Sequence, residues 1–190
     1  ESISYFTSVT NSTYLLPATL ATIPVTPTDT APKLRPFPSW EQNTGKNEME
    51  RIPFPSDSVN PNTTYLNDLV VDNRDGDYAY ITDNSAVDPG IIVFRRRDKK
   101  SWKVRDTKSM SSVTEATFFR INGTTVNLPV NIDGIALGPQ YRTEEGKVDR
   151  KLYYCPLSSF HLYAINVSVL QNESLAQQGE GALRHKRCYV

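Results

Sequence analysis

The sequence predicts an all-β fold made of β-propeller blades, each of them a four-stranded antiparallel sheet. Two observations lead to this prediction. Short runs of β-branched and aromatic residues alternate with turn clusters from residue 65 onward, and the same order begins again near Ile132. Most of the 13 prolines lie before residue 65, where they disfavour long central strands. A β-sandwich has the same strand content and is the alternative fold.

We divide the chain into three parts. Residues 1–64 are a Pro-rich N-terminal segment, residues 65–171 are two blades with an inserted hairpin at 118–127, and residues 172–190 are a flexible tail. Apolar residues make up 38% of the 190 residues, and 10 Tyr and 7 Phe are among them. These large side chains are sufficient for the core of one folded domain.

The first blade is expected between residues 65 and 105. Its four predicted strands are Leu66–Asp72, Tyr78–Asp83, Ile91–Phe94 and Trp102–Arg105. Short turns join them, which favours an antiparallel meander. We interpret the charged run at 95–100 as a solvated turn; a patch for polyanions is the alternative.

The second blade repeats this pattern, with strands expected at 132–138, 151–155 and 161–165. Asp68 and Asp133, which precede the apolar run of each first strand, are 65 residues apart. Ordinary propeller repeats span roughly 40–50 residues. The hairpin at 118–127, with Asn-Gly at its turn, accounts for the excess, because Asn-Gly between β-branched and aromatic flanks is a strong hairpin signal.

The charge balance argues against two classes of partner. The chain has 21 Lys+Arg and 21 Asp+Glu, so its formal net charge is +0, and we expect neither nucleic-acid nor membrane-surface binding. No run approaches the roughly 18–20 apolar residues of a membrane-spanning helix. No signal peptide opens at Glu1; if the protein is secreted, we expect this to be the processed form.

Acceptor triplets for N-glycosylation are dense and predict a secreted, extracellular glycoprotein. They lie at Asn11, Asn62, Asn122, Asn166 and Asn172. Chance occurrence in a chain rich in Asn, Ser and Thr is the alternative. Cys155 and Cys188 are compatible with a disulfide in an oxidising compartment or with two free thiols, because their spacing matches no disulfide framework.

Several strings resemble the major royal jelly protein/yellow family of insects. They are PATLATIP (17–24), PKLRPFPSW (32–40), YLNDLVVD (65–72), DYAYITD (77–83), GIIVFRRRDKKSWKV (90–104), DGIALGP (133–139) and LYYCPLSSFHLYAIN (152–166). The resemblance covers about residues 14–171. It implies a secreted six-bladed β-propeller, which agrees with the glycosylation triplets.

This chain departs from the family pattern in two places. Between residues 40 and 52 the family carries much of another blade, and after Leu170 the last blades are missing. The sequence therefore predicts the remnant of a first blade and two further blades, incomplete relative to a six-bladed ring. Because each blade buries its faces against its neighbours, we expect open apolar faces and a chain that is marginally folded, self-associating through those faces, or dependent on a partner.

The candidate ligand site lies where the first strand of each blade would line a propeller channel. That position is predicted for Asn67, Asp68 and Asp133. The alternatives for these carboxylates are calcium binding and strand-capping hydrogen bonds, which we also weigh for Asp72 and Asp83. With only two histidines and no nucleophile or phosphate motif, the sequence predicts no catalytic residue, metal site or cofactor.

Three functions remain open. The resemblance implies binding of small aromatic or biogenic amines, with Asn67, Asp68, Asp133 and Tyr153 as ligand-binding residues and aromatic side chains against the ligand ring. It also implies a melanin-pathway enzyme that tautomerises dopachrome, in which Asp133 and Asp68 would serve as acid and base. A storage or interaction glycoprotein without a small-molecule site is the third reading.

Overall fold

The computed structural model describes residues 5–9, 12–16, 52–73, 77–177 and 187–189. It divides into two compact units, Glu1–Pro53 and Phe54–Val190. In the first unit, β1 (Tyr5–Val9) and β2 (Ser12–Leu16) form an antiparallel hairpin. The rest of the predicted first-blade remnant and the acceptor Asn11 lie outside the described residues.

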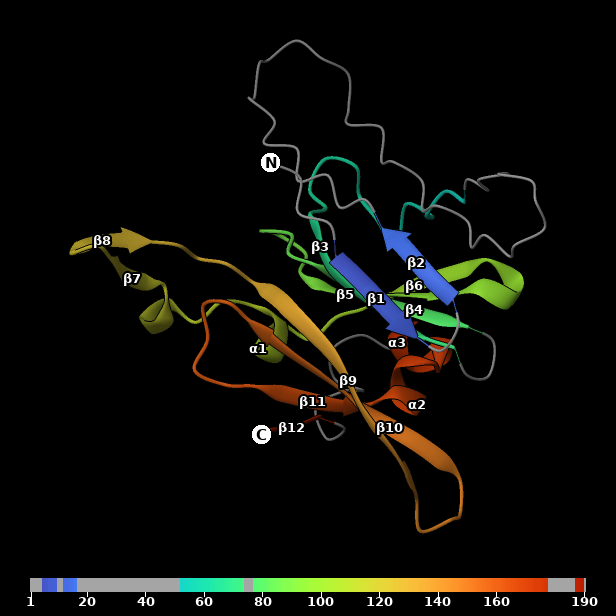
Figure 1. Ribbon diagram of the computed structural model, residues 1–190. Helices are drawn as coiled ribbons and strands as arrows, with labels where there is room; N and C mark the ends of the chain where they lie inside the picture. The colour runs from blue at the N-terminus through green and yellow to red at the C-terminus, as the bar shows by residue number, and fades with distance from the viewer. Residues whose placement is uncertain (1–4, 10–11, 17–51, 74–76, 178–186, 190) are drawn as a thin grey trace. The chain divides into compact units, whose positions relative to one another are not determined.

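The first predicted blade is present as a four-stranded antiparallel sheet (Figure 1). Its strands are β3 (Leu66–Asp72), β4 (Tyr78–Asp83), β5 (Gly90–Arg95) and β6 (Lys100–Val104). They pair in sequence order, which confirms the meander. The charged turn between β5 and β6 is a short 3-10 helix, η1 (Arg96–Asp98).

The second predicted blade is also a four-stranded antiparallel sheet, in the order β12-β11-β10-β9. Its strands are β9 (Ile132–Arg142), β10 (Val148–Pro156), β11 (Tyr163–Asn166) and β12 (Arg187–Tyr189). The first three strands confirm the prediction. The fourth comes from the segment that we expected to be a flexible tail, and its three residues are too few to show the alternation that identifies a strand.

Short helices follow the sheets. α2 (Val167–Leu170) and α3 (Glu173–Gln177) come directly after β11. The expected tail at 172–190 is thus corrected at two points, since α3 and β12 both belong to it. No described helix has the length and apolar character needed to span a membrane.

The connection between the two sheets contains the predicted hairpin. After α1 (Thr107–Met110) and the 3-10 turn η2 (Thr114–Ala116), β7 (Phe118–Ile121) pairs with β8 (Thr124–Asn127). Asn122 and Gly123 both have positive φ, 49° and 83°, which is the backbone of a type I′ turn. Figure 1 shows this hairpin extending away from both sheets.

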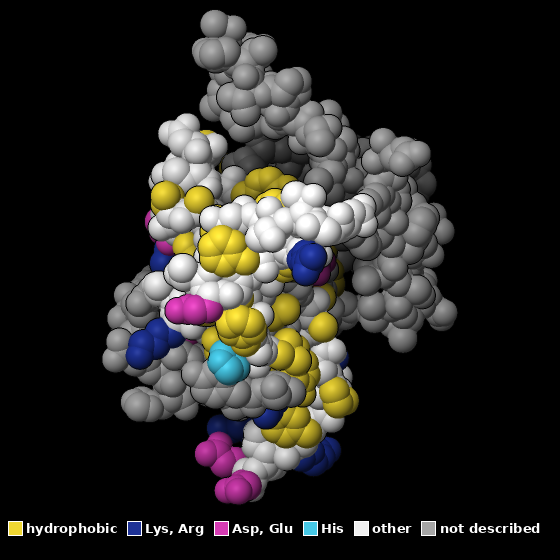
Figure 2. Space-filling view, turned by 90° about the vertical axis from the view of Figure 1, so that its left-hand side faces the viewer, with side chains coloured by type: hydrophobic (Ala, Val, Ile, Leu, Met, Phe, Trp, Pro, Cys, Tyr) yellow, Lys and Arg dark blue, Asp and Glu magenta, His cyan; other side chains and the backbone are white. Residues whose placement is uncertain are grey.

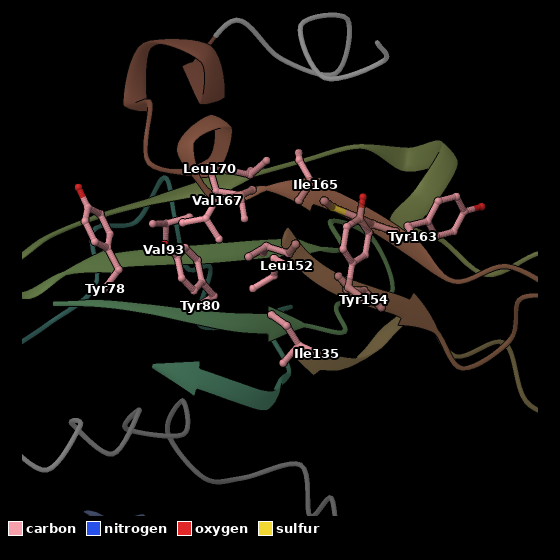
Figure 3. Packing of buried hydrophobic residues seen from close by; sticks show 14 of the residues in the cluster. Tyr78, Tyr80, Val93, Ile135, Leu152, Tyr154, Tyr163, Ile165, Val167 and Leu170 are labelled. Atoms are coloured by element: carbon pink, nitrogen blue, oxygen red, sulfur yellow. The ribbon is translucent and has the colours of Figure 1, made fainter. Parts of the chain in front are cut away.

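The core lies between the two sheets (Figure 3). Tyr80 and Val93 of the first sheet point toward Leu152 and Tyr154 of the second, and α2 closes one side with Leu170. All five side chains are at most 1% exposed. Burial of large apolar side chains contributes about 1.5–3 kcal/mol each, so this interface holds the two sheets together.

Polar groups within this interface are hydrogen-bonded. The indole Nε1 of Trp102 donates to the carbonyl of Leu170 over 2.9 Å, which ties α2 to β6. Ser109 Oγ lies 2.8 Å from the hydroxyl of Tyr154 and donates to Asp106 Oδ2 over 2.5 Å. The connection after β6 is thereby joined to the second sheet by satisfied buried groups.

Buried side chains lie on the opposite face of the first sheet as well. Ile81 and Ile92 on that face are 3% and 0% exposed. The segment before β3 is joined to the same side, because the backbone N–H of Tyr65 donates to Asp83 Oδ1 over 2.7 Å. The sequence could not show this, since a Pro-rich segment gives no periodic signal of what it contacts.

A buried ion pair lies on this face. Lys103 Nζ is 2.7 Å from Asp83 Oδ2, and the two side chains are 1% and 0% exposed. Asp88 extends the network to Lys103 at 3.0 Å and to Arg105 at 2.7 Å. Burial raises the pKa of Asp88, but hydrogen bonds from Arg105 and Lys103 outweigh it and lower that pKa.

The two cysteines lie on strands that do not touch. Cys155 is on β10 and is a free thiol, while Cys188 is on β12 and pairs with Ala164 of β11. Because β11 separates the two strands, their backbones are about 10 Å apart, beyond the roughly 7 Å limit between disulfide-bonded Cα atoms. This fold therefore excludes the Cys155–Cys188 disulfide.

Candidate ligand site at the inner strands

A β-bulge positions the first pair of candidate residues. The pairing of β3 with β4 shifts by one residue between Leu66 and Leu69, so Asn67 and Asp68 together lie opposite Thr82. A bulge of this kind bends its strand and redirects side chains, and it often lies beside a functional site. The sequence contains no local signal for it, because the shift depends on the partner strand.

A second bulge positions Asp133 in the same way. The pairing of β10 with β9 shifts where Cys155 lies opposite Gly134 and Pro156 opposite Ile132. Asp133 is the extra residue between them. Each inner strand, β3 in the first sheet and β9 in the second, thus carries an aspartate at a bulge near its start, which is the structural counterpart of the 65-residue repeat in the sequence.

The two bulges meet. The side-chain amide Nδ2 of Asn67 donates to Asp133 Oδ1. The hydroxyl of Thr82 accepts a hydrogen bond from the backbone N–H of Asp68 and donates to the backbone carbonyl of Asp133, each over 2.9 Å. The structure therefore brings Asn67, Asp68 and Asp133 together from strands of different sheets, as the placement of the first strands predicts.

The two carboxylates differ in their partners. Asp68 accepts from the backbone N–H of Leu69 over 2.8 Å and from that of Ile135 over 3.4 Å, as the strand-capping alternative predicts. Asp133 accepts from Asn67 and, among the described residues, from no backbone N–H. The Asp133 carboxylate is therefore not held by backbone N–H groups of the described residues, and it can bind a cation from solution.

The other two aspartates that we weighed as strand caps have structural partners. Asp83 accepts hydrogen bonds from Tyr65 and Ser85 and pairs with buried Lys103. Asp72 is 1% exposed and lies 3.5 Å from the guanidinium of Arg150. Neither is a candidate for ligand binding.

Burial and a neighbouring charge change the titration of Asp133. Burial raises the pKa of Asp133, and the negative charge of Asp68 raises it further. Burial also raises the pKa of the Cys155 thiol, with a further contribution from Asp133, while a hydrogen bond with the Gly134 backbone opposes the rise. The carboxyl group of Asp133 and the thiol of Cys155 therefore both hold their protons more tightly than usual.

Tyr153 is not brought to the carboxylates. It pairs with Ala136 on β9, and its ring leans over Gly138, where a Cβ atom would lie 2.7 Å from the Tyr153 ring. Gly138 is five residues along β9 from Asp133, about 16 Å at the rise of an extended strand. Tyr153 and Asp133 therefore do not share one small ligand in this fold.

A different aromatic residue, Tyr65, directly precedes β3, the strand that carries Asn67 and Asp68. Tyr65 is 52% exposed, and its backbone carbonyl accepts from the N–H of Asn84 over 2.8 Å, which extends the β3–β4 ladder by one pair. Because side chains alternate along β4, Asn84 and Thr82 lie on the same side of the sheet. Tyr65 is therefore on the side that carries the two bulges.

The description of a matching family model, major royal jelly protein, agrees with the resemblance found in the sequence. The match covers residues 42–188, most of the chain. The chain belongs to the major royal jelly protein family. None of the curated proteins compared with the chain matches it.

The family match begins and ends later than the strings that we quoted. Its end at residue 188 includes most of β12, so this part of the expected tail belongs to the family region. The all-β fold of this royal jelly family chain, with four small antiparallel sheets and no closed barrel in the described residues, agrees with incomplete propeller-like architecture.

No described residues of this royal jelly family protein form a group of three or more His, Cys, Asp or Glu side chains that could hold a metal ion. His161 is exposed between two exposed hydrophobic residues, Phe160 and Leu162, and Figure 2 shows hydrophobic side chains gathered on one face of the molecule. Its ring is 6.1 Å from that of Tyr163 in an edge-on arrangement.

The glycosylation acceptors fall into two groups. Asn62, Asn122 and Asn172 are exposed, and Asn122 is at the tip of the β7–β8 hairpin. Asn166 is half-buried, and its Oδ1 accepts from the hydroxyl of Tyr141 over 2.9 Å. Asn166, which precedes α2, is therefore less accessible than the other described acceptors.

Sequence reasoning missed Thr82, Cys155 and Tyr65 as residues of this site. The bulges place Thr82 and Cys155 opposite the aspartates, and such pairing depends on the register between strands. The one available signal was alternation along β4, which puts Thr82 on the same face as Tyr80.

Proposed function

We propose that this protein is a secreted glycoprotein that binds small aromatic amines where the β3 and β9 bulges meet. One observation carries the proposal: the Asp133 carboxylate is half-buried at a bulge, and its hydrogen bond comes from the Asn67 side chain and not from a backbone N–H. Resemblance to a family with amine-binding members supports the choice of ligand.

The geometry favours a cation over a neutral ligand. Asp133 and Asp68 place two negative charges at one point, and the described side chains in hydrogen-bonding contact with Asp133 and Asp68 include no lysine or arginine. An ammonium group there relieves the repulsion between the carboxylates and forms charge-assisted hydrogen bonds. Tyr65, exposed on the same side, is the aromatic surface that we assign to the ligand ring.

Calorimetric titration of the full chain with serotonin and dopamine tests the proposal. We expect Asp133→Asn to weaken binding about 10- to 100-fold, the loss of one hydrogen bond to a charged group. Asp98→Asn is the matched control, because Asp98 pairs with Arg95 in the turn after β5, at the far end of the sheet. Equal affinities of Asp133→Asn and the parent chain would contradict this site.

Two further variants test which tyrosine ring contacts the bound amine. Tyr65→Ala should weaken amine binding, since the ring loses its stacking surface, whereas Tyr153→Ala should leave it unchanged. The reverse result would restore Tyr153 to the site and require a different position for the ligand.

A second function is favoured by the altered titration of Asp133. Two carboxyl groups from different strands, one of them with a raised pKa, resemble an acid–base pair that could move a proton on dopachrome. Following dopachrome decay with the parent chain, Asp133→Asn and Asp68→Asn tests this activity. If the chain neither binds amines nor turns over dopachrome, the storage or interaction glycoprotein is the remaining interpretation.

A further inference from the structure

Thr82 connects the two bulges by a single buried group. Its side chain is 0% exposed, and it extends from β4 between β3 and β9. The hydroxyl oxygen lies 2.9 Å from the Asp68 nitrogen and 2.9 Å from the Asp133 carbonyl oxygen. One residue therefore bonds to the backbone of both bulged strands.

The hydrogen-bonding capacity of the hydroxyl matches these two partners. A threonine hydroxyl has one proton to donate and two lone pairs to accept with. It gives the proton to Asp133 and accepts from Asp68, and a longer contact of 3.4 Å reaches the Asp68 carbonyl. Because Thr82 is buried, water cannot replace these bonds without moving a strand.

We propose that Thr82 is the positioning residue of the site: its hydroxyl holds the β3 and β9 bulges together and thereby sets the separation of the Asp68 and Asp133 carboxyl groups. This inference deepens the proposed function and rests on it for the ligand alone. The geometric part is independent of any ligand.

Loss of the hydroxyl should separate the carboxylates. The Asp68 N–H and the Asp133 carbonyl would lose their shared partner, and each would move to find another. Among described residues, the titratable groups that face Asp133 are Asp68 from β3 and Cys155 from β10, while β4 contributes the neutral Thr82. Asp133 should therefore titrate closer to an ordinary aspartate once Asp68 is farther away.

Carbon-detected NMR of the full chain labelled at aspartate carboxyl carbons measures this directly, with the Asp133→Asn spectrum providing the assignment. We expect Thr82→Val, which keeps the shape and removes the hydroxyl, to lower the Asp133 pKa by up to about one unit, the scale of a nearby charge. Thr82→Ser keeps the hydroxyl and should retain the parent value. An unchanged pKa in folded Thr82→Val would overturn the proposal.

A double variant separates positioning from a general structural effect. If Thr82 acts by holding Asp68 near Asp133, then Thr82→Val should not lower the Asp133 pKa further in an Asp68→Asn background. An equal shift with and without Asp68 would contradict the proposal. Should Thr82→Val fail to fold, Thr82→Cys, with its weaker donor and acceptor, should give a smaller shift in the same direction.

Serotonin titration of the same variants distinguishes this inference from the proposed function. If the parent chain binds no amine but the Asp133 pKa follows Thr82, the proposed function fails and the positioning role stands. If the parent binds serotonin and Thr82→Val changes neither its affinity nor the Asp133 pKa, the positioning role fails and the proposed function stands.

Discussion

At the residue scale, Asp133 has opposite effects on binding and on stability. Its carboxyl group is the proposed contact for an ammonium ion, yet burial and the charge of Asp68 raise its pKa. The folded chain therefore holds this proton more tightly than the unfolded chain does. Stability from this group is present at low pH and is lost as pH rises through the raised pKa.

Asp133→Asn cannot ionise at this position, so it should remove the loss of folding stability that the parent chain suffers as pH rises. In the window that opens above the ordinary aspartate pKa of 3.8, the variant should melt at a higher temperature than the parent chain. At pH 3 both proteins carry a neutral side chain here and should melt alike. Thermal unfolding followed by circular dichroism at pH 3 and pH 7 measures the difference, and a lower melting temperature of the variant at pH 7 would contradict the assignment.

Cys155 reports on the same carboxyl group. Because burial and the charge of Asp133 raise its thiol pKa, little thiolate is present at neutral pH and alkylation should be slow. In a Cys188→Ser background, Asp133→Asn should accelerate alkylation by iodoacetamide at pH 7.5, with Asp98→Asn as the control. An unchanged rate would show that Asp133 does not act on the thiol.

The glycosylation acceptors should differ in occupancy. Asn122 is exposed at a hairpin tip, while Asn166 is half-buried and accepts from Tyr141. Glycosidase treatment of secreted protein should therefore reveal sugar at Asn122, and Thr124→Ala, which removes that triplet and keeps Asn122, should abolish it. Asn166→Gln should leave gel mobility unchanged; a shift would contradict the structural distinction.

At the scale of elements, alternation and turn chemistry predicted the strands well. The Asn-Gly turn after β7 and the runs that became β3 to β6 have strong local signals, so these elements could be derived from the sequence. The bulges at Asp68 and Asp133 could not, because a one-residue shift depends on how two strands pair. For the same reason, the sequence did not place Thr82 or Tyr65 at the site, and it did place Tyr153 there.

Among the contacts between strands, we expect the loss of the Lys103–Asp83 pair to reduce the stability of the fold most. Both side chains are almost fully buried, so Lys103→Met leaves an unpaired buried carboxylate and should destabilise the fold by about 3–5 kcal/mol. Lys147→Met is the matched control, since Lys147 and Glu145 are 76% and 73% exposed, and it should change the stability little because solvent screens an exposed pair. Chemical denaturation of both variants measures this, and equal losses would contradict the role of the buried pair.

At the scale of the whole molecule, the second sheet has a face with exposed positions. On the side of the second sheet away from the core, Ala136 is exposed and its cross-strand neighbour Tyr153 is half-buried. A propeller blade packs both faces against neighbours, so we expect this face to associate with another copy of the chain.

Light scattering after size exclusion tests that expectation. The purified chain should show a mass that rises with concentration, and Ala136→Lys should return it to the monomer. Val87→Lys, at a loop position that is 73% exposed, should leave association unchanged. A monomer at all concentrations would show that this face needs no partner.

The most direct test of the account is the titration of the Asp133 carboxyl carbon by NMR with and without saturating serotonin. If an ammonium group binds between the bulges, its positive charge should lower the Asp133 pKa, opposing the effects of burial and of Asp68. Binding of serotonin that leaves the Asp133 titration unchanged would place the ligand elsewhere, and an absence of binding would contradict the proposed function itself.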